Sequence, residues 1–273
     1  MSRVERASIV PGPVDGDPPA TGPIPAYALA IMTKAPAAGS VKTRLVPPLT
    51  PDEAARLQAC FLKDTAERIA AVDVKGCAGV AVYTPQGAEP LFRALLPPGF
   101  GLVPQRGDTL GDRLHNAAAD LFAAGYAAVC LVDSDSPTLP PAALERAVAA
   151  LERPGERVVL GPAEDGGYYL IGVKATRGRL FADIEWSTDR VLAQTVARAR
   201  EVGLEVELLP RWYDVDDGPS LCRLCEELVP DVPASGVLPG YPAPHTRAYL
   251  RQLVATGAHR IWPQRVTGGL RSS

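Results

Sequence analysis

Two aspartates separated by one residue, Asp133 and Asp135, follow one of the longest apolar runs of the chain, in the segment DSDSP. In an extended chain alternate side chains point to the same side, so we expect both carboxylates to face one another. Neighbouring carboxylates repel unless a cation lies between them, and Mg²⁺ or Mn²⁺ takes carboxylate oxygens together with substrate phosphates. The pair predicts a metal site, with a turn capped by Ser136 or Thr138 as the alternative.

A basic loop, KAPAAGSVKTRL, follows the first apolar run. Its cationic and turn residues are Lys34, Gly39, Lys42, Thr43 and Arg44. Backbone N–H groups in such turns, with cations beside them, bind phosphate oxygens. The spacing is not that of a Walker A loop, because a single glycine precedes the Lys-Thr pair. We predict a phosphate site, and a solvated basic loop is the alternative.

Two further acidic segments follow predicted strands. In GPAEDGGYYLIG, Glu164 and Asp165 precede Gly166 and Gly167, which permit close backbone approach to a ligand or a tight hairpin turn. In WYDVDDGPSL the acidic residues are Asp214, Asp216 and Asp217. Asp217 or Ser220 could simply cap a helix. Three acidic strand ends in one sheet nevertheless favour a shared site, since clustered carboxylates cost stability unless a metal or a base offsets them.

The segment GDTLGDRLHNA, with the arginine before it, could bind a nucleotide or form a loop ahead of a capped helix. Its candidate residues are Arg106, Asp108, Gly111 and Arg113, whereas we interpret His115 as structural. The Cys222-x-x-Cys225 pair lies in a helical pattern with no second Cys/His pair, so two packed thiols are expected in place of a zinc site. No Ser-His-Asp or Cys-His set indicates nucleophilic catalysis.

Strands alternating with helices must position these residues. The patterns predict strands at 26–32, 79–83, 101–104, 127–132, 157–160, 168–173 and 204–209. They predict helices at 51–72, 89–96, 110–125, 141–152, 188–202, 220–228 and 247–256. This alternation indicates an α/β sandwich with parallel pairing, in which ligands bind beyond the carboxyl ends of the strands. The polar clusters lie where that rule places a site.

Length and charge exclude several classes of protein. The 273 residues carry a net charge of −3, so no basic field attracts nucleic acid or anionic lipid. Apolar runs are far shorter than a membrane span, and the N-terminus lacks a signal-peptide pattern, so we expect a cytoplasmic protein. Residues 1–25 read as a disordered or loosely attached tail, 26–228 as the catalytic domain and 229–273 as a C-terminal extension.

Together the segments KAPAAGSVKTRL, GDTLGDRL, DSDSPTLP, EDGGYYLIG and WYDVDDGPSL resemble a bacterial family provisionally labelled glycosyltransferases. That family is similar to the phospholactate guanylyltransferase of deazaflavin-cofactor synthesis. The resemblance covers about Ala26–Leu228 and implies the nucleotide-diphospho-sugar transferase fold, a Rossmann-like α/β/α sandwich with a mostly parallel central sheet. One departure is Asp217-Gly218, where relatives often have Thr-Pro.

The resemblance also implies roles for particular residues. The phosphates and the rest of the nucleotide would contact the basic loop and the segment that leads into the predicted helix at 110–125 with its first turn. The residues are Lys34, Gly39, Lys42, Thr43, Arg44, Arg106, Asp108, Gly111 and Arg113. The metal ligands would be Asp133, Asp135 and Asp216, and the acceptor pocket would comprise Glu164, Asp165, Gly166, Gly167 and Tyr168. Catalysis would rest on Lys42, Arg44, Asp133 and Asp165.

We expect a Mg²⁺- or Mn²⁺-dependent transferase that takes a nucleotide donor and a small-molecule acceptor. The leading hypothesis is nucleotidyl transfer from an NTP to a phosphorylated or phosphonate acceptor with release of pyrophosphate, because three cations in the basic loop suit a triphosphate. Glycosyl transfer from an NDP-sugar is the alternative, with Glu164 or Asp165 as base. A non-catalytic nucleotide-binding protein is the minor alternative. The oligomeric state is not predicted.

Overall fold

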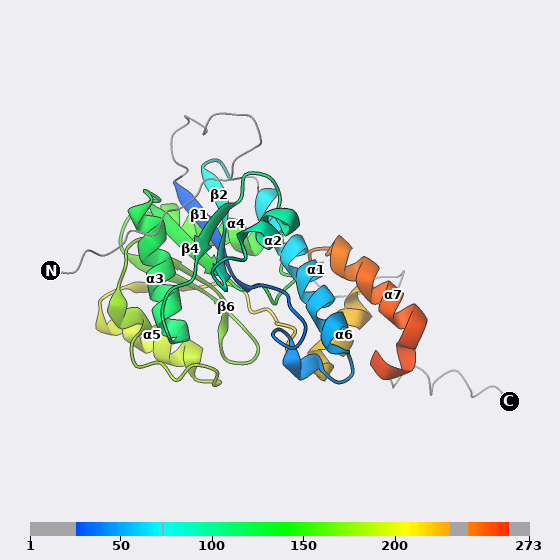
Figure 1. The fold of residues 1–273 in the computed structure, drawn as a ribbon. Coiled ribbons are helices and arrows are strands. Elements are labelled where there is room, and N and C mark those ends of the chain that lie inside the picture. The colour runs from blue at the N-terminus through cyan, green and yellow to red at the C-terminus, as the bar shows by residue number, and fades with distance from the viewer. Residues whose placement is uncertain (1–25, 73, 230–239, 262–273) are drawn as a thin grey trace, which may run out of the picture.

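Seven strands form one mixed sheet in the computed structural model, which describes residues 26–72, 74–229 and 240–261. The strands are β1 (Tyr27–Lys34), β2 (Cys77–Thr84), β3 (Gly101–Pro104), β4 (Ala128–Val132), β5 (Arg157–Pro162), β6 (Tyr168–Val173) and β7 (Glu205–Leu208). Their order across the sheet is β3-β2-β1-β4-β6-β5-β7 (Figure 1). The predicted fold class is confirmed, and all seven predicted strands are present with ends shifted by a few residues.

One strand runs against the others. β6 pairs antiparallel with both β4 and β5, whereas the β1–β2, β1–β4, β2–β3 and β5–β7 pairs are parallel. The amino end of β6 therefore lies at the same edge as the carboxyl ends of the other six strands. Chain order also reverses between β1 and β4, and such a switch point leaves a crevice at that edge.

Helices cover both faces of the sheet (Figure 1). One core cluster joins the sheet to α1 (Pro51–Ala70), α2 (Glu89–Leu95) and α4 (Pro141–Glu152). The other joins it to α3 (Leu110–Ala123), α5 (Val191–Glu201) and the 3₁₀ helix η2 (Gly178–Phe181). Every strand residue of β4 and β5 is buried, as expected for central strands that are covered on both sides.

The start of α1 follows from its sequence. Thr50 accepts a hydrogen bond from the backbone N–H of Glu53, the Glu53 carboxylate accepts from the N–H of Thr50, and Pro51 occupies the first turn. Ala54, Leu57 and Phe61 then recur on one buried face. The predicted cap and helix are confirmed, which matters because this face also carries polar residues that reach the site.

A third core cluster lies beside the sheet and joins α1 to α6 (Gly218–Leu228), α7 (Pro244–Ile261) and the 3₁₀ helix η1 (Thr43–Leu45). Cys222 and Cys225 lie on α6, where Cys225 is buried in this cluster, so the expected packed-helix role is confirmed. The tail predicted for residues 1–25 lies outside the described residues, as do residues 230–239 and 262–273 of the predicted C-terminal extension. No helix in the described ranges has the length and apolar character needed to cross a membrane.

A buried carboxylate attaches α7 to α1. Asp64 of α1 is fully buried and accepts hydrogen bonds from the backbone N–H groups of His245 (3.0 Å) and Thr246 (2.8 Å), which caps the first turn of α7. Beside it, His245 Nε2 lies 2.7 Å from Glu67 Oε1. Asp64, Glu67 and His245 bring one ligand atom each within 4.8 Å of one another, the one such group of three found among the described residues. Capping and the His245–Glu67 contact account for this geometry.

We expect Asp64→Ala to lower the free energy of unfolding by about 1–2 kcal/mol, because two buried N–H groups of α7 lose their acceptor. Hydrogen exchange should show the loss of protection concentrated in the first turns of α7. Glu145→Ala, an exposed change on α4, is the control. Unchanged protection in α7 would show that α7 does not depend on this cap.

Candidate active site

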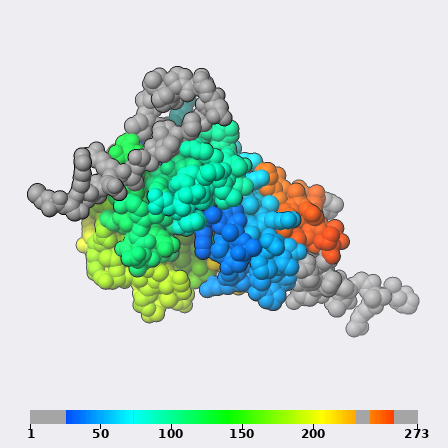
Figure 2. Space-filling view, in the orientation of Figure 1, coloured from blue at the N-terminus to red at the C-terminus, as the bar shows by residue number. Residues whose placement is uncertain are grey.

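Three segments far apart in the sequence meet at the carboxyl edge of the sheet. They are the basic loop after β1, the loop after β4 and the segment between β7 and α6. Together with α1 and the start of α3 they line an open cavity of about 380 Å³. In Figure 2 the dark blue segment after β1 lies at the molecular surface beside the lighter blue start of α1. Of the predicted site residues, the cavity is lined by Lys34, Lys42, Thr43, Arg44, Arg113, Asp135 and Asp216.

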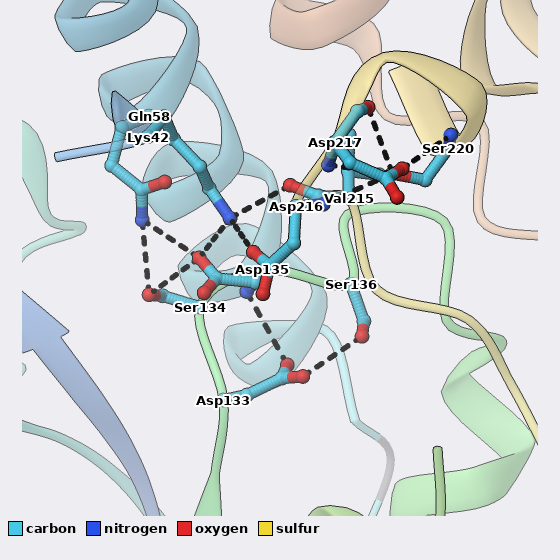
Figure 3. A network of polar contacts seen from close by, with 10 residues as sticks. All are labelled: Lys42, Gln58, Asp133, Ser134, Asp135, Ser136, Val215, Asp216, Asp217 and Ser220. Carbon is cyan, nitrogen blue, oxygen red and sulfur yellow. Dashed lines mark hydrogen bonds and ion pairs between the residues drawn. The ribbon is translucent and has the colours of Figure 1, made fainter. Parts of the chain in front are cut away.

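Lys42 is the centre of this site (Figure 3). Its ammonium lies 2.9 Å from Asp135 Oδ1, 2.9 Å from Asp216 Oδ1 and 2.8 Å from the carbonyl oxygen of Val215. The side chain is 4% exposed. Burial would lower the pKa of Lys42, but Asp135 and Asp216 outweigh that cost and the pKa is raised, so the ammonium stays charged.

The backbone of Lys42 is also unusual. Its φ of 48° and ψ of 38° place a non-glycine residue in the left-handed region, just before η1. Such a conformation costs of the order of 1 kcal/mol and persists only where the surroundings impose it. The three contacts of the ammonium supply that constraint.

Asp135 is held by two neighbours besides Lys42. The Gln58 Nε2 donates to Asp135 Oδ1 (3.1 Å) and to Ser134 Oγ (3.0 Å). Gln58 is 4% exposed, lines the cavity, and its Oε1 is buried without a hydrogen-bond partner. Sequence reasoning missed Gln58 and Ser134, although a glutamine on the apolar face of α1 was a signal. A buried acceptor with no partner is typical of a position that a ligand group completes.

Asp133 and Asp135 take different partners, contrary to the predicted extended pair. The chain bends at 134–135, Asp133 Oδ1 accepts from the N–H of Asp135 (3.4 Å), and Oδ2 accepts from Ser136 Oγ (2.9 Å). This is the turn chemistry named as the alternative. Burial first, then repulsion from Asp135 and Asp214, raises the pKa of Asp133 to about 8. The structure thus brings Asp135 and Asp216 together on Lys42 and places Asp133 behind them.

A buried arginine supports this turn from the α1 side. Arg68 is fully buried, and its Nη1 donates to the carbonyl oxygens of Ser136 (3.1 Å) and Pro137 (2.9 Å). Burial lowers the pKa of Arg68 to about 10, and Asp133 is the largest opposing influence. A fully buried guanidinium needs such carbonyl and carboxylate partners, so Arg68 fixes the position of the turn that carries both aspartates. Sequence reasoning missed it as well.

The predicted acceptor segment forms the turn between β5 and β6. Asp165 Oδ1 accepts from the N–H of Gly167 (2.8 Å), and Gly166 has a φ of +93° with the Asp189 backbone where a Cβ would lie. Glu164 Oε2 lies 2.6 Å from Arg223 Nη1. Tyr168 packs against Trp186 and the core cluster beneath α3 and α5. None of these residues lines the cavity described above.

Asp214, which was not among the predicted site residues, lies near Asp165. Burial, followed by repulsion from Asp165, Asp216 and Asp135, raises the pKa of Asp214 to about 6. Asp217 caps α6 through Ser220, as the structural alternative predicted. The acidic residues therefore divide into a capping residue, Asp217, and a coupled group at the sheet edge.

The predicted nucleotide segment, which runs from the loop before α3 into its first turn, reaches the cavity at one of its four predicted positions. Arg113 lines the cavity and its Nε donates to the carbonyl of Gly107 (3.1 Å). Arg106 instead pairs with Asp120 of α3, and Asp108 is exposed. A Cβ at Gly111 would lie 2.8 Å from the Phe181 carbonyl oxygen, so this glycine allows η2 to pack on α3. Gly39 has a φ of +74° in the turn of the basic loop, outside the lining.

The raised pKa of Asp133 predicts a pH-dependent stability. Asp133 binds its proton more tightly in the folded state than in the unfolded state, where its pKa is about 4. The free energy of unfolding of the protein should therefore fall as pH rises from about 4 to about 8. In protein treated with a chelator, Asp133→Asn should remove that decline. Its free energy of unfolding in urea at pH 8 should exceed that of the wild type by about 1 kcal/mol or more. Asp52→Asn, at an exposed position on α1, is the control. Equal pH dependence in both variants would contradict the assignment.

The family match to this chain includes two of the loops at this edge of the sheet. The DUF2064 family of uncharacterized proteins conserved in bacteria matches residues 65–188, which include the turn after β4 and the β5–β6 hairpin. A search of curated proteins gave no match. CMP:2-keto-3-deoxy-manno-octonic acid synthetase complexed with CTP is 13% identical over 72% of this chain and 96% of that chain, with a TM-score of 0.48. At that TM-score the likeness bears on neither fold nor reaction.

A much nearer relative comes from Desulfovibrio desulfuricans G20. Its crystal structure, described provisionally as that of a nucleotide-diphospho-sugar transferase, is 31% identical and has a TM-score of 0.72. The match covers 84% of this chain and 95% of that chain, so the likeness extends over most of both chains and not over one motif alone. The chain belongs to the same family as this protein, the nucleotide-diphospho-sugar transferases, and is a transferase.

Proposed function

We propose that the chain is a nucleotidyltransferase that moves an NMP group from an NTP to a small phosphorylated or phosphonate acceptor. The observation that carries the proposal is the lining of the cavity. Lys34, Lys42, Arg44 and Arg113 come from two separate segments, yet they line a single cavity that also contains two carboxylates. Cations in that number suit the charge of a triphosphate, and the carboxylates suit a divalent ion bound to it.

The donor set fits Mg²⁺ or Mn²⁺. Asp135 and Asp216 each place one carboxylate oxygen 2.9 Å from the same ammonium nitrogen, so both oxygens already face one cationic position. Both side chains are partly exposed, at 34% and 42%, and hard oxygen donors are the ligands these ions prefer. A bound divalent ion would neutralise charge on the phosphoryl oxygens during the reaction.

The remaining chemistry belongs to the protein's own side chains. An oxygen of the acceptor phosphate attacks the α-phosphorus; one P–O bond forms, the bond to the bridging oxygen breaks, and pyrophosphate leaves. Lys34, Arg44 and Arg113 would bind and orient the phosphates and stabilise the charge that builds on the leaving group. The buried Gln58 Oε1 would accept a hydrogen bond from the bound nucleotide. No side-chain nucleophile is required.

The first test measures thermal stabilisation by ATP, GTP, CTP, UTP and a set of NDP-sugars in Mg²⁺. A ligand that binds only the folded state raises its stability by RT ln(1 + [L]/Kd). We expect one NTP to raise the melting temperature more than any NDP-sugar does. We also expect Arg113→Gln to lower the affinity for that NTP about tenfold, because one charge-assisted phosphate contact is lost.

The control for this test is Arg200→Gln, an exposed change at the end of α5. It removes the same charge far from the cavity lining and should leave nucleotide affinity unchanged. Release of pyrophosphate in the presence of phosphate-monoester acceptors then tests turnover. Stabilisation by NDP-sugars with inert NTPs would overturn the proposal.

Glycosyl transfer is the second candidate, and Asp214 favours it. A carboxyl with a pKa of about 6 is a stronger base than an ordinary carboxylate, and Asp165 lies near it at the sheet edge. If Asp214 activates an acceptor hydroxyl, turnover of an NDP-sugar should fall as pH drops below about 6, where the carboxyl takes up its proton. An Asp214→Asn variant that retains the same pH profile would exclude that role.

A further inference from the structure

All three N–H bonds of the Lys42 ammonium have an acceptor in this structure. A lysine ammonium has three donors and no acceptor, and here Asp135, Asp216 and the Val215 carbonyl take them at 2.8–2.9 Å. The ammonium lies between the two carboxylates that would hold a divalent ion (Figure 3). Lys42 therefore cannot bind a phosphate in this arrangement without giving up one of its three contacts.

We propose that Lys42 is an internal cation that occupies the divalent-ion position, and that a polyphosphate must draw its ammonium away before Mg²⁺ or Mn²⁺ binds there. The inference rests on the proposed function, since it concerns the same cavity and the same metal. It adds an order of binding. The divalent ion alone binds weakly, and it binds tightly once the polyphosphate of the nucleotide has moved the Lys42 ammonium.

Charge and geometry support this exchange. A divalent ion entering beside a buried ammonium would meet like charge at short range, whereas two carboxylates without any cation would repel each other. Lys42 lines the same cavity as Lys34, Arg44 and Arg113, so a polyphosphate bound by those three lies within the cavity that the Lys42 side chain already faces. The flexible four-carbon stem of lysine permits that movement.

The support around Asp135 persists when Lys42 leaves. Gln58 Nε2 and Ser134 Oγ both contact Asp135 Oδ1, and Asp216 is fixed at the start of α6 by the hydrogen bond from its N–H to Ser220 Oγ (3.0 Å). The Asp135 carboxylate and the backbone of Asp216 are thus held by groups other than Lys42. A site whose ligands keep their position can exchange one cation for another.

The first experiment measures Mn²⁺ affinity without nucleotide, by electron paramagnetic resonance of free Mn²⁺. We expect Lys42→Gln to bind Mn²⁺ at least about tenfold more tightly than the wild type, because the competing charge is gone. Lys42→Arg, which keeps the charge, should bind Mn²⁺ no more tightly than the wild type. Lys34→Gln removes a charge from the same cavity at a residue that forms no ion pair within the described part of the chain, and should change the affinity by less than about threefold.

A second experiment follows the wild-type protein and needs a variant only to assign one signal. The buried NζH₃⁺ group of Lys42 should give a protected ¹⁵N signal, assigned by its loss in Lys42→Arg. Mg²⁺ alone should leave this signal in place, whereas Mg²⁺ with inorganic tripolyphosphate should shift or broaden it. An unchanged signal under conditions where tripolyphosphate raises the melting temperature would overturn the proposal.

The results separate this inference from the proposed function. If an NTP stabilises the protein but Lys42→Gln and wild type bind Mn²⁺ equally, Lys42 is a permanent structural ion and the inference fails while nucleotidyl transfer stands. If Lys42→Gln gains Mn²⁺ affinity but no NTP is bound or turned over, the exchange stands and the proposed function fails.

Discussion

The ammonium of Lys42 joins three segments that no secondary structure connects. Its partner Asp216 lies 174 positions away in the sequence, and its partner Asp135 lies on the turn after the central strand β4. The sheet brings these segments to one edge, but hydrogen bonds between strands stop where the strands end. Beyond that point the almost wholly buried ammonium with its three donors fixes their relative positions, together with the hydrogen bond from the N–H of Val215 to the carbonyl oxygen of Asp135 (3.0 Å). The left-handed backbone of Lys42 is maintained by the same contacts.

Helix α1, which packs on one face of the sheet, also reaches the site and supports the contacts of Lys42. Its buried face is apolar at Leu57 and Phe61 but presents Gln58 to Asp135 and Arg68 to the turn after β4. Polar groups on a packed helix cost stability unless each finds a partner. Here the partners are the functional loops, so the helix that builds the core also orients the carboxylates.

Much of the fold could be predicted from the sequence because its signals are local. The apolar runs gave the seven strands, and Thr50, Pro51 and Glu53 marked the start of α1. The place of β6 between β4 and β5, and its reversed direction, could not be predicted, because nothing within YYLIGV encodes which strand it pairs with. That choice depends on packing between residues distant in the sequence.

The site was predictable in its residue types but not in its pairing. Basic and acidic loops at strand ends indicated where Lys42, Asp135 and Asp216 would gather. Their sequence could not show that the lysine lies between the carboxylates, or that a bend separates Asp133 from Asp135. Spacing specifies side-chain direction only while the chain is extended, and the chain leaves the extended conformation after Val132. Gln58 and Arg68 were missed because helix periodicity was read for apolar residues alone.

The β5–β6 turn has a consequence for how this architecture diversifies. It leaves and re-enters the sheet at the ligand edge through five residues, Ala163 to Gly167, closed by the N–H of Ala163 and the carbonyl of Gly167 at 3.0 Å. Gly166 is fixed against the Asp189 backbone, so insertions are confined to the neighbourhood of Glu164 and Asp165. Extra residues there would leave the strand register unchanged, whereas a shift in any one of the segments joined by Lys42 would alter its contacts in the other two. The two halves of this edge therefore differ in how a change of length would be transmitted: it stays local in the hairpin and spreads through Lys42 in the other half.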